Sequence, residues 1–471
     1  MMQTFAKINI NIYLCTLKNN QKESNMQTSR RNFLKTAGTA SALLGVGGVL
    51  PGFSAASYSR IVGANERIRL SVVGVESRGK ALATNFARLS ECEVATICDV
   101  DQRAIDKCVD AVEKVQQKTP KGEKDFRVSL ADKNIDAVVI AMPDHWHTPA
   151  ALLALQAGKH VYLEKPVSHN PREGEMLIEA TAKYGKVVQV GNQRRSWPNL
   201  IQAMNEIQSG AIGKIHSGKM WYANTRPSIG IGKIVRVPDW LDWDSWQGPA
   251  PRTVYKDNIL HYNWHWFWHW GTAESGGNGV HMVDLLCWGM NLKYPKKISS
   301  AGGRYYHNDD WETPDTQIIT LEYDHAVLTL EANSCNGKRT EDSSVGVIFY
   351  GDTGSLFISG GNDYTVFDQK NKVIKDVKSN IGFEQGNTVN PSQQLDAIHF
   401  QNFFDAIRTG APLACTAELG HQCTALMLLG NIALRVGRTL NLNPANGHII
   451  GDSEAQRFWS RDYEPGWEPK I

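Results

Sequence analysis

The sequence predicts an α/β fold in which an N-terminal domain with a parallel sheet precedes a second α/β domain. Three observations support this prediction. Short apolar runs alternate with helical stretches between residues 68 and 190, a turn with glycines at both ends follows the first run, and later apolar runs are separated by tight turns. The 471 residues, 42% hydrophobic and 21% charged, suffice for two or three domains and exclude a disordered or fibrous chain.

The N-terminal region has the pattern of an export signal. The run Ser29-Arg30-Arg31-Asn32-Phe33-Leu34-Lys35 precedes a weakly apolar stretch, 37–50, and the small residues 54–57. It resembles a twin-arginine signal, which exports folded proteins. We therefore expect residues 1–57 to be a signal region, Met26 to be the true start, and the mature protein to be periplasmic or secreted. No membrane anchor is expected after signal removal, because no cysteine follows the apolar stretch.

Charge and cysteine spacing exclude two further classes of protein. The 50 basic and 48 acidic residues give a formal net charge of +2, and no long basic run is present, so no nucleic-acid partner is expected. The eight cysteines form no C-x-x-C pair, which argues against a zinc knuckle.

The segment 68–99 has the layout of a Rossmann dinucleotide-binding unit. A strand at 68–73 leads through a turn to a helix at 80–89, and a second strand at 94–98 ends in an acid. Such a turn lets the backbone approach a diphosphate, the helix N-terminus supplies amide donors, and the acid binds ribose hydroxyls. Because this carboxylate would repel a 2′-phosphate, NAD is the expected cofactor. The expected cofactor residues here are Gly74, Ser77, Arg78, Gly79 and Asp99.

Glu76 stands where the G-x-G-x-x-G pattern has its middle glycine, which keeps side chains away from the diphosphate. Two interpretations are open. Glu76 points outward to solvent while Ser77, Arg78 and the helix amides hold the phosphates, or the cofactor site is degenerate. We expect the first, because Arg78 can offset the charge and the rest of the unit is intact.

Further strands at 137–141, 160–163 and 187–190 follow helices at 102–117, 149–157 and 172–184, which completes an NAD-binding domain over residues 66–193. In an open sheet of this kind, ligands bind beyond the carboxyl ends of the strands. The polar clusters after these strands are therefore expected to meet at one edge. The candidate cofactor residues are Met142, His145, Trp146, His147, Glu164, Lys165, Asn192 and Gln193, and Arg194 is a candidate substrate residue.

The second domain is expected to span residues 194–445, with a C-terminal tail at 446–471 that packs on the domains. Its expected elements are a helix at 198–209, strands at 214–222, 317–323, 326–332 and 345–350, and helices at 395–408 and 417–437. A tight hairpin turn is expected at 351–354.

Seven tryptophans lie between residues 240 and 270, a stretch named the aromatic segment below. If 261–270 is extended, its four tryptophans face one side, and His265 and His269 face the other. Aromatic faces stack on sugar rings, which favours a carbohydrate site, although most such side chains are simply buried. We expect only one or two to contact a ligand, and the substrate candidates are Tyr262, Trp264 and His265.

Four histidines, at 261, 265, 269 and 281, raise the question of a metal. They show no H-x-x-x-H helix and no obviously paired carboxylate, so no metal is expected.

The glycine turn, the acid after the second strand, Pro143-Asp144-His145-Trp146-His147 and Glu164-Lys165-Pro166 occur in this order. Together they resemble the glucose-fructose oxidoreductase, inositol dehydrogenase and MocA family over residues 66–471. The resemblance implies an open, mainly antiparallel second sheet that faces the nicotinamide and often forms an oligomer interface, so a homo-oligomer is expected. It also implies a sugar or cyclitol substrate whose hydroxyl contacts Lys165, and an often cis Lys165-Pro166 bond.

A histidine that acts with the lysine is implied as well, and His281 of Gly279-Val280-His281-Met282-Val283-Asp284 matches it. The sequence departs from the inositol-dehydrogenase-like members at Gly277, where they have an aspartate. Without that carboxylate, the proton-accepting arrangement of a simple alcohol dehydrogenase is incomplete. The expected catalytic residues are Lys165 and His281.

Three functions remain open. The main prediction is an NAD-dependent oxidoreductase that acts on a sugar or sugar derivative and holds its cofactor tightly, since export removes the protein from the NAD pool. The first alternative is an NAD-dependent glycosidase that oxidises a sugar, eliminates the glycosidic bond and returns the hydride. Asn278-Gly279-Val280-His281 and the tryptophan-rich run before it partly resemble its α-N-acetylgalactosaminidase branch. The second alternative is a non-catalytic carbohydrate-binding member.

Overall fold

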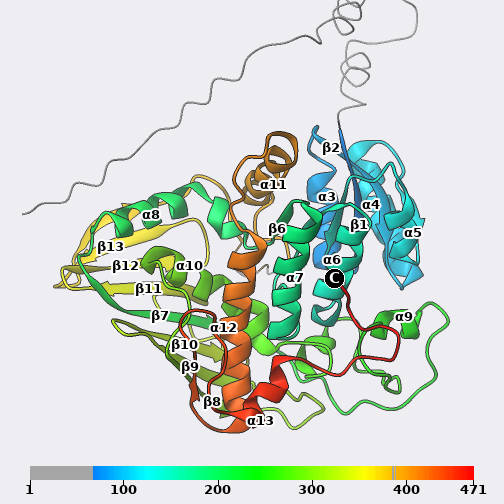
Figure 1. Ribbon diagram of the computed structural model, residues 1–471. Coiled ribbons are helices and arrows are strands. Elements are labelled where there is room, and N and C mark those ends of the chain that lie inside the picture. Colours follow the sequence, from blue (N-terminus) through cyan, green and yellow to red (C-terminus); the bar gives the residue numbers. More distant parts are fainter. Residues whose placement is uncertain (1–66, 385–386, 388) are drawn as a thin grey trace, which may run out of the picture. The chain divides into compact units, whose positions relative to one another are not determined.

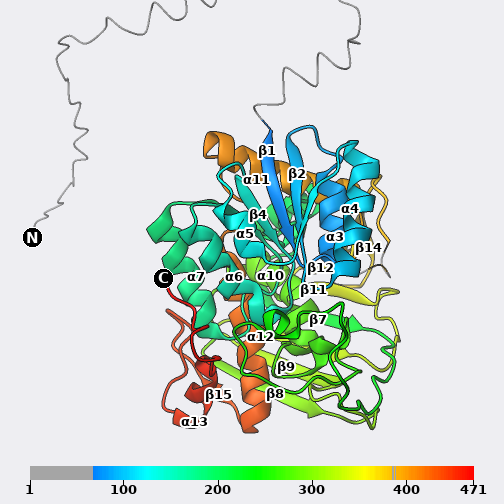
Figure 2. The ribbon, with the colours of Figure 1, turned by 90° about the vertical axis from the view of Figure 1, so that its right-hand side faces the viewer.

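Six parallel strands form the first sheet, in the order β3-β2-β1-β4-β5-β6 (Figures 1 and 2). The computed structural model describes residues 67–384, 387 and 389–471, so the twin-arginine motif lies outside the described residues. The strands are β1 (Ile68–Val73), β2 (Cys92–Cys98), β3 (Lys121–Glu123), β4 (Ala137–Ile140), β5 (His160–Leu163) and β6 (Val188–Val190). This is the strand order of a dinucleotide-binding fold, which confirms the predicted Rossmann domain.

Three of the five helices described in the first domain, α4, α5 and α7, start at a side-chain cap. The Asp101 side chain accepts a hydrogen bond from the Arg103 backbone N–H at the start of α4, and Asn170 caps α7 in the same way through Glu173. The helices are α3 (Arg78–Phe86), α4 (Gln102–Gln116), α5 (Phe126–Ala131), α6 (His147–Gln156) and α7 (Pro171–Tyr184). The short elements β3 and α5 were not predicted.

The second sheet has nine strands, in the order β14-β13-β12-β11-β7-β10-β9-β8-β15. Only β7 and β10 pair in parallel, so the expectation of a mainly antiparallel sheet is confirmed. The strands are β7 (Ile215–Ala223), β8 (Lys297–Gly303), β9 (Thr316–Glu322), β10 (Val327–Asn333), β11 (Val345–Gly351), β12 (Gly354–Ser359), β13 (Tyr364–Asp368), β14 (Val373–Val377) and β15 (Leu440–Asn441). The predicted tight turn joins β11 to β12.

Helices cover one face of this sheet and leave the other open. The covering core draws on α8 (Pro198–Gln208), α10 (Val280–Met290) and α12 (Ala417–Val436). Both views place α12 beside α7 of the first domain and β8 of the second sheet. On the open face Ile318 is 50% exposed. No helix within the described ranges is long and apolar enough to cross a membrane.

Helix α11 (Gln393–Thr409) returns to the first domain, although it lies late in the chain. Phe400 stacks on Phe86 of α3 with ring centroids 3.8 Å apart, and both belong to the core of the Rossmann sheet. The short helices α9 (Trp243–Gln247) and α13 (Ser453–Gln456) complete the described α-helices.

The aromatic segment is not an extended strand. Residues Asn263–Trp266 form a 3₁₀ turn, so the two-sided arrangement considered for 261–270 is wrong. Trp266 and Trp270 are each 3% exposed, because Trp270 packs in a core formed by the segment and Trp266 stacks on Trp311 with ring centroids 4.0 Å apart. As expected, most tryptophans of the segment, at 243, 246, 266 and 270, are buried.

The aromatic segment docks on the first domain. The Gln102 backbone N–H donates to the Trp240 carbonyl at 3.3 Å, and the His145 backbone N–H donates to the Trp270 carbonyl at 3.2 Å. The segment therefore lies against the loops after β2 and β4, at the carboxyl edge of the Rossmann sheet.

Candidate active site

A cavity of about 540 Å³ opens at the carboxyl ends of the Rossmann strands. Among the predicted site residues, those that line it are Gly74, Ser77, Arg78, Asp99, Met142, Trp146, His147, Glu164, Lys165, Gln193, Tyr262, Trp264, His265 and His281. Predicted residues that do not line it are Gly79, His145, Asn192 and Arg194. The expected convergence of three strand ends on one edge is therefore what the structure shows.

The glycine turn is shaped for close backbone approach. Gly74 has φ +80°, and a Cβ there would lie 2.7 Å from the Ala141 carbonyl oxygen. A Cβ on Gly79 would lie only 1.8 Å from the Gly74 carbonyl oxygen. Since α3 begins at the end of this turn, its N-terminal amides face a cradle that fits the diphosphate of a dinucleotide.

Asp99 fixes the turn to the end of β2. Its carboxylate accepts hydrogen bonds from the backbone N–H groups of Val75 at 2.7 Å and Asp101 at 3.0 Å. Burial raises the pKa of Asp99 despite these hydrogen bonds. Asp99 lines the cavity, where its position fits the ribose hydroxyls of NAD.

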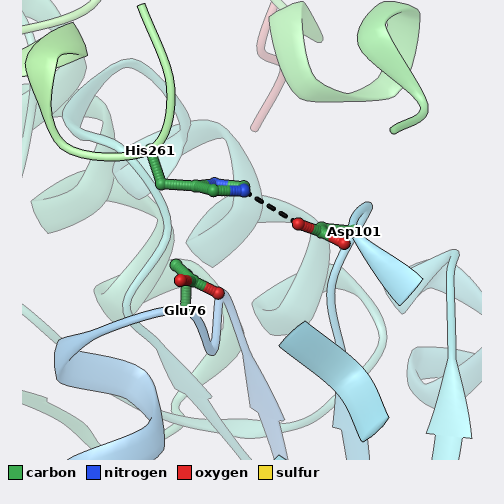
Figure 3. Close-up of side chains that lie close together, drawn as sticks. All are labelled: Glu76, Asp101 and His261. Atoms are coloured by element: carbon green, nitrogen blue, oxygen red, sulfur yellow. Dashed lines mark hydrogen bonds and ion pairs between the residues drawn. The ribbon is translucent and has the colours of Figure 1, made fainter. Parts of the chain in front are cut away.

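Glu76 does not point outward to solvent, and that prediction is wrong. It is half-buried and lines the cavity, where it meets His261 from the aromatic segment and Asp101 (Figure 3). His261 Nε2 lies 2.8 Å from Asp101 Oδ2. No short-range pattern predicts this proximity, because His261 lies near Glu76 only when the aromatic segment folds over the turn.

Carboxylate and imidazole atoms of Glu76, Asp101 and His261 all lie within 4.8 Å of one another, a spacing that could hold a metal ion. Asp101, however, already accepts hydrogen bonds from Arg103 at 2.8 Å and is bonded to His261. The cluster is thus satisfied in part by the chain itself, and the absence of a metal stays a prediction.

Arg78 does not offset the charge of Glu76, because it is paired elsewhere. Its guanidinium contacts Glu164 and Asp396, each at 2.9 Å. Burial opposes the ionisation of Glu164, but the charges of Arg78 and Lys165 outweigh it and lower the pKa of this carboxyl. The pair thereby ties α3 to the strand end that carries Lys165.

Lys165 lies in the cavity with its amine held by a neutral partner. Its Nζ donates to the Gly277 carbonyl oxygen at 2.8 Å, and the Lys165-Pro166 bond is cis, as expected. Burial lowers the pKa of Lys165 below its ordinary value. The partner of the amine is therefore a backbone carbonyl and not a carboxylate.

Gly277 belongs to a π-helical turn, Ser275–Gly279, directly before α10 and His281. A Cβ on Gly277 would meet open space. His281 lines the cavity, and burial, reinforced by the positive charges of Arg194 and Lys165, holds its pKa well below the ordinary value. The imidazole is therefore neutral, with its Nδ1 lacking a hydrogen-bond partner in the described part of the chain.

An Arg226–Glu274 ion pair, which the sequence did not predict, also belongs to the site. Both residues line the cavity, with Nη2 of Arg226 3.2 Å from Oε1 of Glu274. Ser334 Oγ also donates to Glu274 at 3.0 Å, and Arg226 lies 5.5 Å from the ring centres of Tyr262 and Trp266. No local motif marks this pair, since β7 and the π turn bring the two residues together.

His265 contributes a neutral imidazole to the lining of the cavity. Its Nδ1 lies 2.6 Å from the Tyr262 carbonyl oxygen, and because a carbonyl only accepts, Nδ1 carries the proton. The ring stacks on Trp264 at 3.6 Å. Burial lowers the pKa of His265 to about 3, so it stays uncharged with Nε2 as a free acceptor.

Two family descriptions match the chain. "Oxidoreductase family, NAD-binding Rossmann fold" matches residues 68–192, and "Oxidoreductase family, C-terminal alpha/beta domain" matches residues 230–441.

Curated relatives of the chain are glycosidases by name. A glycosyl hydrolase family 109 protein of Saccharopolyspora erythraea is 29% identical over 227 residues, which are 45% of this chain and 49% of the relative. An alpha-N-acetylgalactosaminidase of Shewanella oneidensis is 27% identical over 210 residues, 41% of this chain and 45% of the relative. The chain spans about half the length of the curated relatives it matches.

Solved structures share the fold. A levoglucosan dehydrogenase in complex with NADH and levoglucosan has a TM-score of 0.61 at 18% identity, over 80% of this chain and 99% of that one. The WlbA dehydrogenase of Bordetella pertussis, in complex with NADH and UDP-GlcNAcA, has a TM-score of 0.59 at 20% identity over the same shares. At these identities the similarity establishes the architecture alone.

Proposed function

Because the chain belongs to the oxidoreductase family with an NAD-binding Rossmann domain and a C-terminal α/β domain, we propose that it is an NAD-dependent oxidoreductase that acts on a hydroxyl of a sugar or sugar derivative. One observation carries the proposal. The Lys165 amine, held at 2.8 Å by a neutral carbonyl, lies beside neutral His281 in the cavity that the glycine turn opens on.

The chain's own residues supply binding and proton transfer. The Gly74 to Gly79 turn and the α3 amides fit the diphosphate, and Asp99 fits the ribose hydroxyls. When bound, NAD supplies a hydride acceptor. Lys165 accepts the proton of the substrate hydroxyl at Nζ, which its lowered pKa favours, and the Gly277 carbonyl keeps Nζ in place. His281 Nε2 is available to hydrogen-bond the same hydroxyl.

The test has a cofactor arm and a turnover arm. Mass spectrometry of heat-denatured protein is expected to find NAD, and a panel of free sugars is expected to give nicotinamide absorbance with at least one member. Lys165→Ala should lower turnover by about 100-fold or more while NAD content stays unchanged. Lys183→Ala, at an exposed position of α7, is the matched control and should behave like wild type. No NAD in the protein and none bound on titration would refute the proposal.

A second candidate is the redox-assisted glycosidase, favoured by the glycosidase names of the curated relatives. In it, oxidation of a ring hydroxyl to a ketone would acidify the neighbouring C–H, and loss of that proton would expel the aglycone. Water would then add at the anomeric carbon, and return of the hydride to the ketone would restore the hydroxyl. Lys165 would again take the hydroxyl proton, with His281 or His265 beside the ring. Release of nitrophenol from nitrophenyl glycosides without net NADH formation separates this reaction from the dehydrogenase.

Export and assembly belong to the same proposal. An exported enzyme works without a cofactor pool, so the docked aromatic segment, joined to the loops after β2 and β4, would serve to retain NAD. The open face of the second sheet, with half-exposed Ile318, is the proposed contact for a homo-oligomer. Cell fractionation, NAD content after prolonged dialysis and sedimentation test these three points.

A further inference from the structure

A smaller cavity of about 200 Å³ adjoins the proposed reaction centre. It shares Lys165, Gln193, Asn278 and His281 with the large cavity, so the two form neighbouring compartments around the same lysine and histidine. The residues new to it include Arg194, which follows β6, and Arg339, on the loop between β10 and β11.

The charges around this compartment have one sign. Lys165, Arg194 and Arg339 line it, and none of its described lining residues is an aspartate or glutamate. The rest of its polar lining is uncharged: asparagine, glutamine, serine and tyrosine side chains and the neutral imidazole of His281. The positive charges also act on His281. Burial lowers the pKa of its imidazole, and the charges of Arg194 and Lys165 lower this pKa further.

Arg194 is buried without a counterion in contact. It is 8% exposed, and its Nη2 and Nε donate only to the Gly360 carbonyl oxygen, at 3.0 and 3.3 Å. The carboxylates that act on it from a distance are committed, Asp284 to Arg195 at 2.7 Å and Asp396 to Arg78 at 2.9 Å. Burial lowers the pKa of Arg194 to about 10.

A buried charge without a partner destabilises a protein, so such a group is retained where a ligand supplies the opposite charge. Arginine is suited to this, because its planar guanidinium binds carboxylates, sulfates and phosphates through paired hydrogen bonds. Arg339 is exposed and makes no ion pair within the described residues, which leaves its guanidinium free to reach the same ligand group.

We propose that this compartment is an anion subsite and that the substrate is a sugar carrying a carboxylate, sulfate or phosphate group, which Arg194 and Arg339 bind while its hydroxyl faces Lys165. The inference rests on the proposed sugar-binding function and narrows it to acidic sugars.

The test measures binding rather than turnover, so that it does not depend on the redox reaction. Calorimetry on the purified full chain with its cofactor compares D-glucuronate, D-galacturonate, glucose 6-sulfate and glucose 6-phosphate with glucose, galactose and methyl glucuronate. At least one acidic sugar is expected to bind ten times more tightly than its neutral counterpart, and its affinity should fall as salt is added. The acidic sugar that binds most tightly shows whether the subsite prefers a carboxylate, a sulfate or a phosphate group. Equal affinity for acidic and neutral sugars would overturn the inference.

Variants assign the effect to the two arginines. Arg194→Met should weaken binding of the acidic sugar about tenfold or more, and Arg339→Met severalfold, with affinity for neutral sugars unchanged. Lys338→Met, next to Arg339 but outside the cavity lining, is the matched control and should bind like wild type. Arg194→Lys keeps the charge and should recover part of the affinity.

Melting temperature separates a binding role from a structural one. Because Arg194→Met removes an unpaired buried charge, the ligand-free variant should melt no lower than wild type. A variant that melts earlier and still binds the acidic sugar normally would assign Arg194 to the fold and refute the subsite. Protein that binds acidic sugars through Arg194 but contains no NAD would refute the proposed oxidoreductase and leave the subsite intact.

Discussion

Gly277→Asp is the sharpest test of how the reaction centre works with a neutral partner for Lys165. Gly277 lies in a π turn, its carbonyl accepts from Lys165 Nζ at 2.8 Å, and a Cβ there meets open space. The larger side chain can therefore be accommodated, and its carboxylate would lie a few ångströms from the lysine amine. The expected result is a Lys165 that holds its proton more strongly, since a nearby negative charge favours the ammonium form.

The magnitude follows from the distance. Two unit charges about 4 Å apart interact by about 4 kcal/mol at an effective dielectric constant of about 20. At about 1.36 kcal/mol per tenfold change, this would raise the pKa of Lys165 by about three. Side-chain motion and water in the cavity reduce the effect, so we expect the lysine titration to move upward by one to two pH units.

Two assays read this change. Competitive labelling of lysines with acetic anhydride at a series of pH values, followed by peptide mass spectrometry, gives the titration of Lys165 without a substrate. With a sugar from the screen, the lower limb of the pH dependence of kcat/KM should move to higher pH by the same amount. Gly277→Asn has nearly the same shape without the charge and is the control. If the Asp and Asn variants titrate alike, the reasoning about the neutral partner of Lys165 is wrong.

Three further substitutions probe other parts of the molecule. His281→Ala should lower the rate without changing the pH profile between about 6 and 7, because the lowered pKa keeps His281 neutral there; a variant that only melts earlier would show a structural role instead. Gly79→Ala should weaken NAD binding about tenfold or more in calorimetry, since its Cβ would lie 1.8 Å from a backbone oxygen, whereas Gly382→Ala, where nothing lies within 4 Å, should not. Phe400→Ala should lower the free energy of unfolding by about 3–5 kcal/mol in urea denaturation, because the ring is fully buried against Phe86; a loss below about 1 kcal/mol would contradict the shared core.

The parts of the fold that the sequence predicted are those with local signals. The Rossmann domain could be predicted because its buried strands alternate with helices along the sequence. The glycines of the first turn mark a known pattern, and the structure shows that a Cβ at Gly74 or Gly79 would clash with the backbone. The return of α11 to the first domain could not be predicted in this way, because Phe400 and Phe86 are joined only by tertiary packing. The extended conformation considered for 261–270 was wrong for the same reason. The composition of this stretch suits a strand, but the burial of Trp266 and Trp270 favours a turn.

The residues of the candidate site also fall into a predictable group and an unpredictable one. Lys165 and His281 are predicted from the family resemblance of the motifs that contain them, and both line the cavity. The positions of Glu76 and of the Arg226–Glu274 pair depend on long loops that fold onto the edge of the sheet, for which a single sequence holds no short-range signal.

Two features of the reaction centre change the pKa of Lys165 in the same direction. The neutral Gly277 carbonyl beside Nζ and the buried charge of Arg194 near the reaction centre both favour a Lys165 that gives up its proton before substrate binds. An anionic substrate group bound by Arg194 would offset that positive charge and raise the pKa of Lys165 again once the complex has formed. A neutral substrate would leave the pKa of Lys165 low. The lower limb of the kcat profile, which reports the complex, should therefore lie at higher pH for an acidic sugar than for a neutral one, and the limb of kcat/KM, which reports the free enzyme, should be the same for both.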